Sequence, residues 1–258
     1  MTTFLLLYLL LLLAVFLLQR KLLYFPSTFS QRQQEAQLTE LSLKPWPSAN
    51  QLHGLTSKTP PPNPQGTVLV FHGNAGSAVH RTYFIDALHN LGYRIIVAEY
   101  PGYGTRQGPP TESALIRDGI VAAKLAVREF GEPLFLCGES LGSGVAAGIV
   151  ASQEVPVKGL LFITPFDSMA NVAQHHYWYF LARWLLLDSY DNISRLIDYR
   201  GPVAMVLADK DEIIPARNSL ALFDSLAGPK KLWRFAGASH NTLPLQPWWR
   251  EAMKFIDD

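Results

Sequence analysis

The sequence predicts an α/β fold in which helices flank a mostly parallel β-sheet. Two observations carry this prediction: short runs rich in Val, Ile, Leu and aromatic residues recur along the chain, and stretches of helical periodicity separate them. Such runs are typical of strands buried on both faces, and their alternation with helices indicates βαβ units. The predicted strands are residues 67–71, 94–99, 133–138, 159–164, 203–208 and 231–235. The predicted helices are residues 80–91, 111–130, 143–150, 219–226 and 248–256.

Length and composition bound the classes of function. The chain has 258 residues, of which 48% are hydrophobic, and a formal net charge of +1. Once the N-terminus is set aside, this is enough for one core of roughly 220–230 residues. A net charge near zero gives no electrostatic reason to expect nucleic acid as a partner. The single cysteine, Cys137, excludes an intrachain disulfide and a Cys-rich metal site. The adjacent histidines His175 and His176 would point apart on a helix and have no carboxylate spaced to join them, so no metal is expected. No cofactor is implied.

The N-terminus contains an unbroken apolar run from residue 4 to residue 18, closed by Gln19, Arg20 and Lys21. With Thr2 and Thr3, about 17 residues could enter the hydrocarbon of a bilayer, which is the low end for a spanning helix. We therefore expect a single-pass membrane anchor over residues 1–24, with residues 2–18 in the bilayer. The basic pair after the helix weakly favours a cytoplasmic location for that flank.

Two other interpretations of this run compete with a retained anchor. A cleaved signal peptide would carry basic residues before the apolar run and a small-residue cleavage site after it, and the sequence has neither. A buried core helix would carry polar residues on one face, which are absent here. The remaining residues, 25–258, are expected to form one α/β domain. The proline cluster at 59–64 is expected to be a hairpin connection or a surface loop.

A G-x-S-x-G pattern at residues 138–142 marks the candidate nucleophile, Ser140. The apolar run 134–137 precedes it and a stretch of small residues follows it, which predicts a strand, a sharp turn and a helix. The turn lifts the hydroxyl clear of the sheet, where a base can remove its proton. Glycines at 138 and 142 remove Cβ atoms where strand and helix crowd each other.

A general base for Ser140 is expected at His240. Of the seven histidines, only His240 lies in a glycine-bounded loop just after the last predicted strand. A neutral imidazole can accept the serine proton near pH 7. His72 belongs to a Gly-rich loop after the first buried strand, and we expect it to shape that loop and not to act as the base.

An acid should orient the imidazole and stabilise its cation. Asp211 follows the strand 203–208 and precedes an apolar, proline-terminated stretch, which favours it. Asp209 and Glu212 are close alternatives in the same loop, and Asp167 is a further one after the preceding strand.

Two backbone amides should form an oxyanion hole for the developing charge. The amide of Leu141, immediately after the nucleophile, is the first expected donor. The second is expected from the loop 72–77, most directly the amide of Asn74. The same loop lacks the G-x-x-x-x-G-K pattern of a phosphate cradle.

With serine, acid and histidine in that order, the sequence resembles the α/β-hydrolase superfamily. Within it, four segments resemble the membrane-anchored Bem46-type branch: LLYFPS at 22–27, FHGNAGS at 71–77, YPGYG at 100–104 and DEIIP at 211–215. The resemblance implies an α/β-hydrolase fold, with Ser140, Asp211 and His240 as the catalytic triad. It also implies Asn74 and Leu141 as oxyanion donors. Glu99 and Ala208 depart from the family pattern, where Asp and Gly are more common.

The function expected from these residues is that of a membrane-anchored serine hydrolase of the esterase, lipase or thioesterase type. Its substrate would be a small-molecule or lipid acyl compound. An insertion over about residues 165–200 is rich in aromatic residues and is expected to form a small helical cap over the serine. The alternative is that these aromatic residues only fill the core. A serine peptidase and a non-catalytic anchored binding or scaffold protein remain alternative functions.

Overall fold

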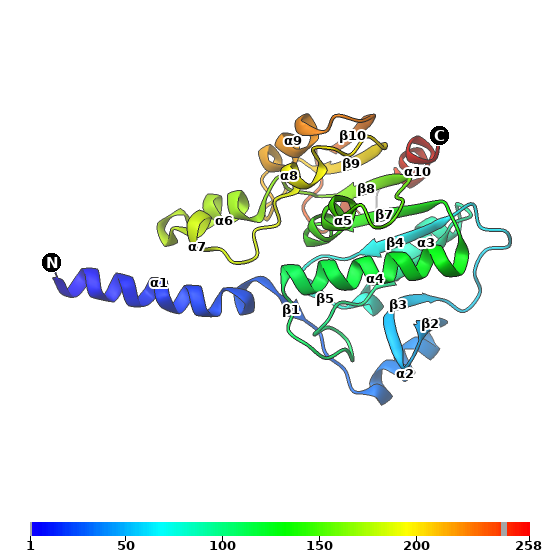
Figure 1. Cartoon of the computed structure of the whole chain (residues 1–258), viewed down its shortest axis with the longest axis horizontal. Coiled ribbons are helices and arrows are strands. Elements are labelled where there is room, and N and C mark those ends of the chain that lie inside the picture. Colours follow the sequence, from blue (N-terminus) through cyan, green and yellow to red (C-terminus); the bar gives the residue numbers. More distant parts are fainter. Residues whose placement is uncertain (1, 244–246) are drawn as a thin grey trace.

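The computed structural model describes residues 2–243 and 247–258 and shows an eight-stranded sheet between two layers of helices (Figure 1). The strand order is β10-β9-β8-β7-β4-β6-β3-β2, and the six strands from β10 to β6 run parallel. The strands of this parallel part are β4 (Thr67–Phe71), β6 (Arg94–Ala98), β7 (Leu134–Glu139), β8 (Gly159–Ile163), β9 (Val203–Ala208) and β10 (Lys230–Phe235). All six match the strands predicted from the sequence to within one or two residues.

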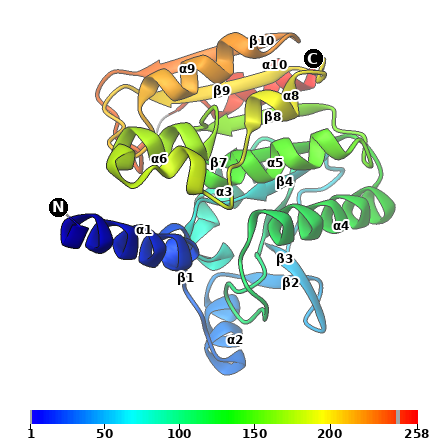
Figure 2. The ribbon, with the colours of Figure 1, turned by 60° about the vertical axis from the view of Figure 1, so that its left-hand side comes forward.

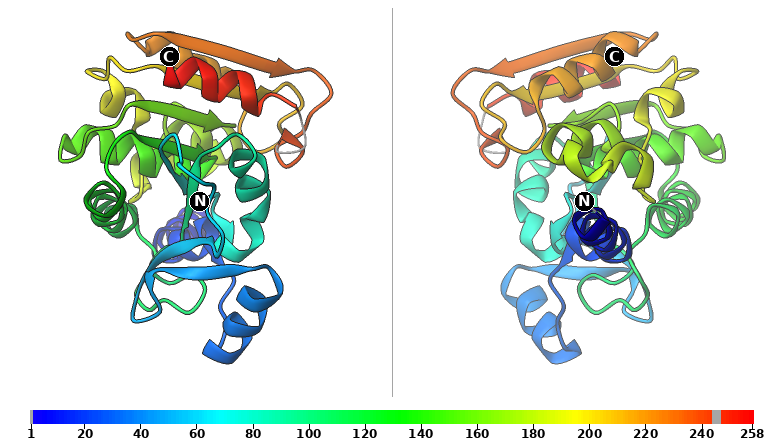
Figure 3. Two further views of the ribbon diagram at one scale, coloured as in Figure 1. Left: turned by 90° about the vertical axis from the view of Figure 1, so that its right-hand side faces the viewer. Right: turned by 90° about the vertical axis from the view of Figure 1, so that its left-hand side faces the viewer.

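The helices cover both faces of the sheet. On one face lie α4 (Glu112–Phe130), α5 (Leu141–Ser152), α8 (Asn192–Leu196) and α9 (Ala216–Ser225). On the other lie α3 (Thr82–His89), preceded by the 3-10 turn η1 (Ala78–Arg81), and α10 (Trp249–Asp257). Figure 3 shows α3 and α4 on opposite sides of the sheet. Two buried clusters of apolar side chains, one on each face, form the core.

The sheet is extended at one edge by an antiparallel hairpin that was not predicted. Strands β2 (Leu43–Ser48) and β3 (Gln51–Ser57) pair with each other, and β3 pairs with β6. Pro45 and Pro47 lie in β2, the edge strand, where a missing amide breaks no ladder hydrogen bond. Residues 59–64 connect β3 to β4, which are not neighbours in the sheet, so they form a loop and not a hairpin turn.

The N-terminal segment consists of a long helix and a short one. Helix α1 (Thr2–Leu23) projects from the body of the protein (Figure 1), and most of its side chains are exposed. It has a mean hydropathy of 2.4 over its most apolar window, so by length and composition it could cross a membrane. The short strand β1 (Phe25–Pro26) and helix α2 (Gln31–Glu40) follow. Helix α2 begins with a capping box, in which Ser30 and Gln33 satisfy each other's backbone amides.

The insertion between β8 and β9 forms a small helical layer beside α1 (Figure 2). It contains α6 (Met169–Tyr177), the 3-10 turn η2 (Trp178–Phe180), α7 (Ala182–Leu185) and, where the chain returns to the core, α8. Trp178 and Trp184 are 66% and 72% exposed. These two tryptophans therefore lie at the surface. The alternative that the aromatic residues of the insertion only fill the core is excluded for them.

Candidate active site

Ser140 occupies a strained turn between β7 and α5. Its backbone has φ 50° and ψ −117°, a conformation that an L-residue adopts only when the surroundings enforce it. The surroundings do so through Gly142, where an added Cβ would lie 1.9 Å from the carbonyl oxygen of Phe71. The amide of Ser140 donates to the carbonyl of Ile163 at 2.9 Å, which ties the turn to the neighbouring strand. The tight approach of helix to strand presents Ser140 at the end of β7.

His240 and Asp211 come together at the carboxyl ends of β9 and β10. The Nδ1 atom of His240 lies 2.7 Å from Oδ2 of Asp211. The second carboxylate oxygen, Oδ1, accepts hydrogen bonds from the amides of Ile213 (2.9 Å) and Ile214 (2.7 Å). The two side chains are 8% and 3% exposed. The pair is therefore shielded from water, and the carboxylate is held in one orientation.

The three other candidate acids have different partners. Asp209 pairs with Arg234 at 2.8 Å. Asp167 accepts hydrogen bonds from the side-chain amides of Asn171 (2.6 Å) and Asn218 (2.8 Å). Glu212 contacts His240 only through the backbone amide, at 3.4 Å. Of the four carboxylates, Asp211 alone meets the imidazole ring.

Ser140 and His240 do not share a hydrogen bond within residues 2–243 and 247–258. The Ser140 side chain has no hydrogen-bond partner there, and the residue is 8% exposed. His240 engages Asp211 through Nδ1, so Nε2 remains the atom available to accept a proton. In ligand-free sites, the bond between nucleophile and base is often long and tightens when substrate binds.

The loop after β4 lies against the serine. A Cβ built on Gly73 would lie 3.7 Å from Cβ of Ser140, which places this loop in contact with the turn. The Asn74 carbonyl accepts hydrogen bonds from Phe25 and Tyr103. Its backbone amide has no hydrogen-bond partner within the described part of the chain. The amide of Leu141 opens helix α5, where the first amides lack intrahelical acceptors.

The imidazole of His72 is fully buried beneath this loop. Its Nδ1 lies 2.7 Å from the carbonyl oxygen of Gly73, and the hydroxyl of Tyr100 donates to the carbonyl of His72 at 2.8 Å. Because a carbonyl oxygen can only accept, Nδ1 carries the hydrogen in this contact. The ring is thus engaged with the loop backbone and not with Ser140.

Sequence reasoning missed a polar cluster directly behind the serine. The carboxylate of Glu139 accepts hydrogen bonds from Tyr83 (2.6 Å), Arg81 (3.0 Å) and the amide of Gly73 (3.2 Å). Burial raises the pKa of Glu139, but the Arg81 charge and these hydrogen bonds outweigh it, so the pKa lies below its ordinary value. The one feature of the sequence that could have indicated this cluster is Glu139 itself, an acidic residue at the end of an otherwise apolar strand.

The cap histidines, His175 and His176, have protein partners. His175 contacts Arg217, and Nε2 of His176 lies 2.9 Å from the carbonyl of Ile213. Among the described residues, no group of three or more His, Cys, Asp and Glu side chains is placed to hold a metal ion.

Comparison with known proteins places the chain in a family. Residues 62–195 match the family described as serine aminopeptidase, S33. An uncharacterized protein of Mycobacterium tuberculosis is 36% identical over 177 residues, covering 67% of this chain and 62% of that protein. Lysophosphatidylserine lipase ABHD12 of Danio rerio is 28% identical over 187 residues, covering 64% of this chain and 48% of the lipase. The chain thus matches only about half to three-fifths of the length of these relatives.

Solved structures support the fold. Est1E of Butyrivibrio proteoclasticus, with ferulic acid bound, has a TM-score of 0.62 at 18% identity and covers 76% of this chain and 92% of its own. The monoacylglycerol lipase of Paleococcus ferrophilus has a TM-score of 0.58 at 19% identity and covers 78% and 96%. The predicted α/β-hydrolase fold is confirmed, whereas the resemblance to the Bem46-type branch stays a prediction.

Proposed function

Because the chain belongs to the serine aminopeptidase S33 family of α/β-hydrolases, we propose that it is a membrane-anchored serine hydrolase of ester, thioester or lipid acyl bonds. The observation that carries the proposal is the shielded His240–Asp211 pair at the sheet edge where the strained turn presents Ser140. In parallel sheets of this kind, loops at the carboxyl ends of the strands collect at one edge and form the site.

The proposed reaction is a two-step acyl transfer to water. Ser140 Oγ attacks the substrate carbonyl carbon while His240 Nε2 takes the hydroxyl proton, and Asp211 stabilises the imidazolium that forms. The amides of Leu141 and Asn74 receive the oxyanion. His240 then protonates the leaving group, and the acyl-serine is hydrolysed by a water that His240 activates. Loss of one oxyanion donor should raise the barrier by about 3–4 kcal/mol.

The test uses an active-site-directed fluorophosphonate and a short soluble ester. We expect wild-type protein to be labelled and to hydrolyse the ester, and Ser140→Ala to do neither while retaining the wild-type melting temperature. Ser152→Ala is the matched control, because Ser152 is the last residue of the same helix, α5, and its hydroxyl donates to the carbonyl of Ile149 at 2.7 Å, away from the turn. Equal ester hydrolysis by Ser140→Ala and wild type would refute the serine mechanism.

We propose that α1 is a retained anchor, comprising residues 1–24, and not a cleaved signal. Cleavage would sever the contacts that the end of α1 makes with the rest of the protein. Arg20 pairs with Asp188 at 2.9 Å, and Tyr24 shares a 2.9 Å hydroxyl contact with Tyr190. Mass spectrometry of the membrane-extracted protein tests this point, and a mature N-terminus after residue 24 would contradict it.

The exposed aromatic surface of the cap supports a lipid substrate. The cap segment that carries the exposed Trp178 and Trp184 contacts α1, because Tyr8 on that helix donates to the carbonyl of Tyr179 at 2.6 Å. With residues 2–18 in the bilayer, this contact would bring the exposed aromatic surface of the cap against the membrane, and tryptophan is favourable where such a surface meets the interface. The bilayer could then deliver acyl chains to the edge of the sheet.

Two assays test the substrate class. In a panel of esters of graded acyl length, we expect long chains to be preferred, and indifference to length would count against a lipid substrate.

The double variant W178S/W184S tests the role of the exposed tryptophans. It should hydrolyse vesicle-borne lipid esters more slowly than wild type and should hydrolyse a soluble short ester as fast as wild type. An equal loss on both substrates would show that the tryptophans act on the fold and not at the membrane.

A further inference from the structure

The segment that follows helix α1 is built into the candidate oxyanion loop. Strand β1 (Phe25–Pro26) pairs in parallel with β5 (Ala75–Gly76), which belongs to that loop (Figure 1). The amide of Phe25 donates to the carbonyl of Asn74 at 3.0 Å, and the amide of Ser27 donates to the carbonyl of Gly76 at 2.7 Å. Segments about 50 residues apart in sequence thus form one small sheet of their own, separate from the main sheet.

The side chain of Asn74 ties the loop directly to α1. Its Nδ2 donates to the carbonyl of Leu23, the last residue of the helix, at 2.7 Å. The last carbonyls of a helix lack intrahelical donors, so this amide satisfies a group that the helix itself cannot. The hydroxyl of Tyr103 donates to the Asn74 carbonyl at 2.6 Å.

These contacts define the direction of the Asn74 amide. The N–H of Asn74 shares its peptide plane with the carbonyl of Gly73, which His72 holds at 2.7 Å. In a trans peptide the N–H and C=O point in opposite directions, so a fixed carbonyl fixes the amide. The carbonyl and side chain of Asn74 are fixed on the other side by Phe25, Tyr103 and Leu23. The backbone amide of Asn74, which has no hydrogen-bond partner within the described chain, is thereby held in one direction and left for a ligand.

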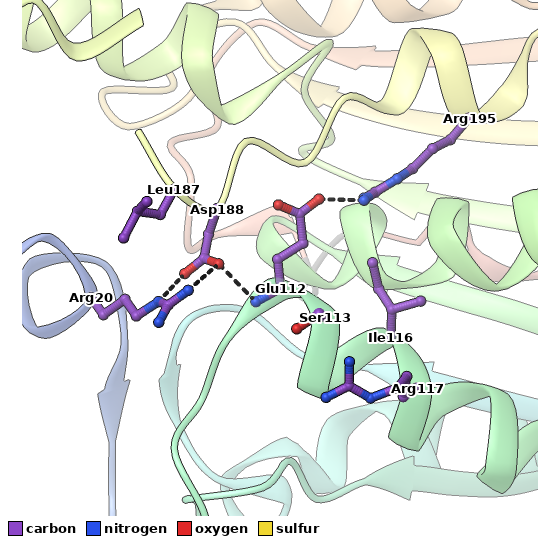
Figure 4. Close-up of a pocket in the computed structure, with 8 residues that line it drawn as sticks. All are labelled: Arg20, Glu112, Ser113, Ile116, Arg117, Leu187, Asp188 and Arg195. Carbon is purple, nitrogen blue, oxygen red and sulfur yellow. Dashed lines mark hydrogen bonds and ion pairs between the residues drawn. The ribbon is translucent and has the colours of Figure 1, made fainter. Parts of the chain in front are cut away.

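The end of α1 is also clamped to the core on a second side (Figure 4). Arg20 makes two hydrogen bonds to the carboxylate of Asp188, at 2.9 and 3.2 Å, and Asp188 also accepts from the amide of Glu112 at 3.2 Å. Side chains from α1, α4 and the chain returning from the cap line a cavity of about 400 Å³ at this junction. Residues 20–27 are therefore held at both ends by contacts with the body of the protein.

We infer that residues 23–27 position the oxyanion loop, with the side chain of Asn74 as the positioning group that links the last turn of the anchor to the catalytic amide. This inference rests on the proposed function. Its consequence is that the catalytic site responds to the orientation of the anchor helix: a shift of Leu23 moves Asn74 and the amide that receives the oxyanion. Displacements of about 1 Å in a catalytic group can lower the rate by about a hundredfold.

The experiment uses the full chain in detergent micelles, with p-nitrophenyl butyrate as a soluble ester. The variants are Asn74→Ala, which keeps the backbone amide but loses the tie to Leu23, and Tyr103→Phe, which loses the hydroxyl but keeps the buried ring. The control is Asn90→Ala, because the side chain of Asn90 likewise donates to a backbone carbonyl, that of Asp86, but at the exposed end of α3. The measurements are kcat, KM, the rate of fluorophosphonate labelling, and hydrogen–deuterium exchange of peptides 23–28 and 72–78.

For Asn74→Ala we expect kcat and the labelling rate to fall by about tenfold or more with KM within about twofold of wild type. Tyr103→Phe should change kcat in the same direction, and Asn90→Ala should match wild type. Exchange should accelerate in both peptides together in the first two variants. If Asn74 had only a structural role, Asn74→Ala would lower the melting temperature without a fall in kcat at constant KM. This result would overturn the inference.

The exchange measurement separates failure of the inference from failure of the proposed function. Normal labelling of wild type, with unchanged kcat and unchanged exchange in Asn74→Ala, refutes the link between anchor and loop and leaves the hydrolase intact. Absence of labelling and of ester hydrolysis in wild type refutes the proposed function and the catalytic role of the loop with it.

Discussion

The Nδ1 atom of His240 lies 2.7 Å from the carboxylate of Asp211. The other ring nitrogen, Nε2, is therefore left free to accept a proton. An asparagine at 211 could accept or donate here and would permit the wrong imidazole tautomer. We expect Asp211→Asn to lower kcat by about a thousand- to ten-thousandfold with the fold intact. The control is Asp209→Asn. Asp209 lies two residues before Asp211 and pairs with Arg234 at the surface, so this variant should retain kcat within about twofold of wild type. Steady-state hydrolysis of a soluble ester checks both variants.

Glu139 should make the stability of the protein depend on acid. Its pKa in the folded state is depressed, so its ionised form stabilises the fold fully above the unfolded pKa of about 4.3. That contribution is lost as the pH falls from about 4.3 through the lower folded pKa. We expect Glu139→Gln to cost about 1–3 kcal/mol of unfolding free energy at pH 7 and progressively less below about pH 4.3.

Urea midpoints measured from pH 7 to pH 3 check the prediction for Glu139. Glu132→Gln is the control, because that carboxylate is exposed and has no hydrogen-bond partner among the described residues. If the difference in unfolding free energy between Glu139→Gln and wild type stayed constant from pH 7 to pH 3, the carboxylate charge of Glu139 would not contribute to stability.

The turn at Ser140 should tolerate no side chain at residue 142. An alanine there would place Cβ 1.9 Å from the carbonyl oxygen of Phe71, so strand β4 or helix α5 must shift. We expect Gly142→Ala to destabilise the fold by about 3 kcal/mol or more, measured by denaturant unfolding. Gly237→Ala serves as the control, because an added Cβ at Gly237 has nothing within 4 Å. Equal stability of the two variants would show that the helix is not pressed against the strand.

The pair of Arg20 and Asp188 should protect the end of α1 from protease. Trypsin cleaves after Arg20 or Lys21 only when this segment opens from the core. We expect Asp188→Asn to speed cleavage there by about tenfold, which corresponds to about 1.4 kcal/mol of opening free energy. Asp198→Asn should leave the rate unchanged, because Asp198 and Arg200 form an exposed pair at 4.0 Å. Timed proteolysis in detergent, read by mass spectrometry, checks the two rates.

The parallel sheet was predictable because its strands carry a signal that is independent of their neighbours. Strand β9, for example, is apolar at every position and buried at every position, so its residues alone identify it. Helix α4 was predictable because Thr111 and Glu112 mark its start and an apolar stripe follows. The residues of the His240–Asp211 pair were predictable from their places after strands, since parallel strands bring such loops to one edge.

Other features were not predictable, because they depend on partners distant in sequence. The prolines at 45 and 47 argued against a strand, and only the edge position of β2 makes one possible. Helix α2 has little apolar periodicity, so its capping box at Ser30 was the remaining signal. The tie between Asn74 and Leu23 joins segments about 50 residues apart, and no local pattern reports it.

The two edge strands of the main sheet, β2 and β10, affect how readily copies of the protein associate with one another. Copies anchored through α1, as proposed above, would share a plane and meet often, and an open sheet edge is a template on which another copy could add a strand. At one border, Pro45 and Pro47 in β2 withhold two of the amides that such addition requires. At the opposite border, β10 carries charged side chains at its two exposed positions, Lys231 and Arg234, and charged residues on an edge strand hinder the addition of another strand. Both borders thus disfavour lateral self-association of the protein through its sheet edges.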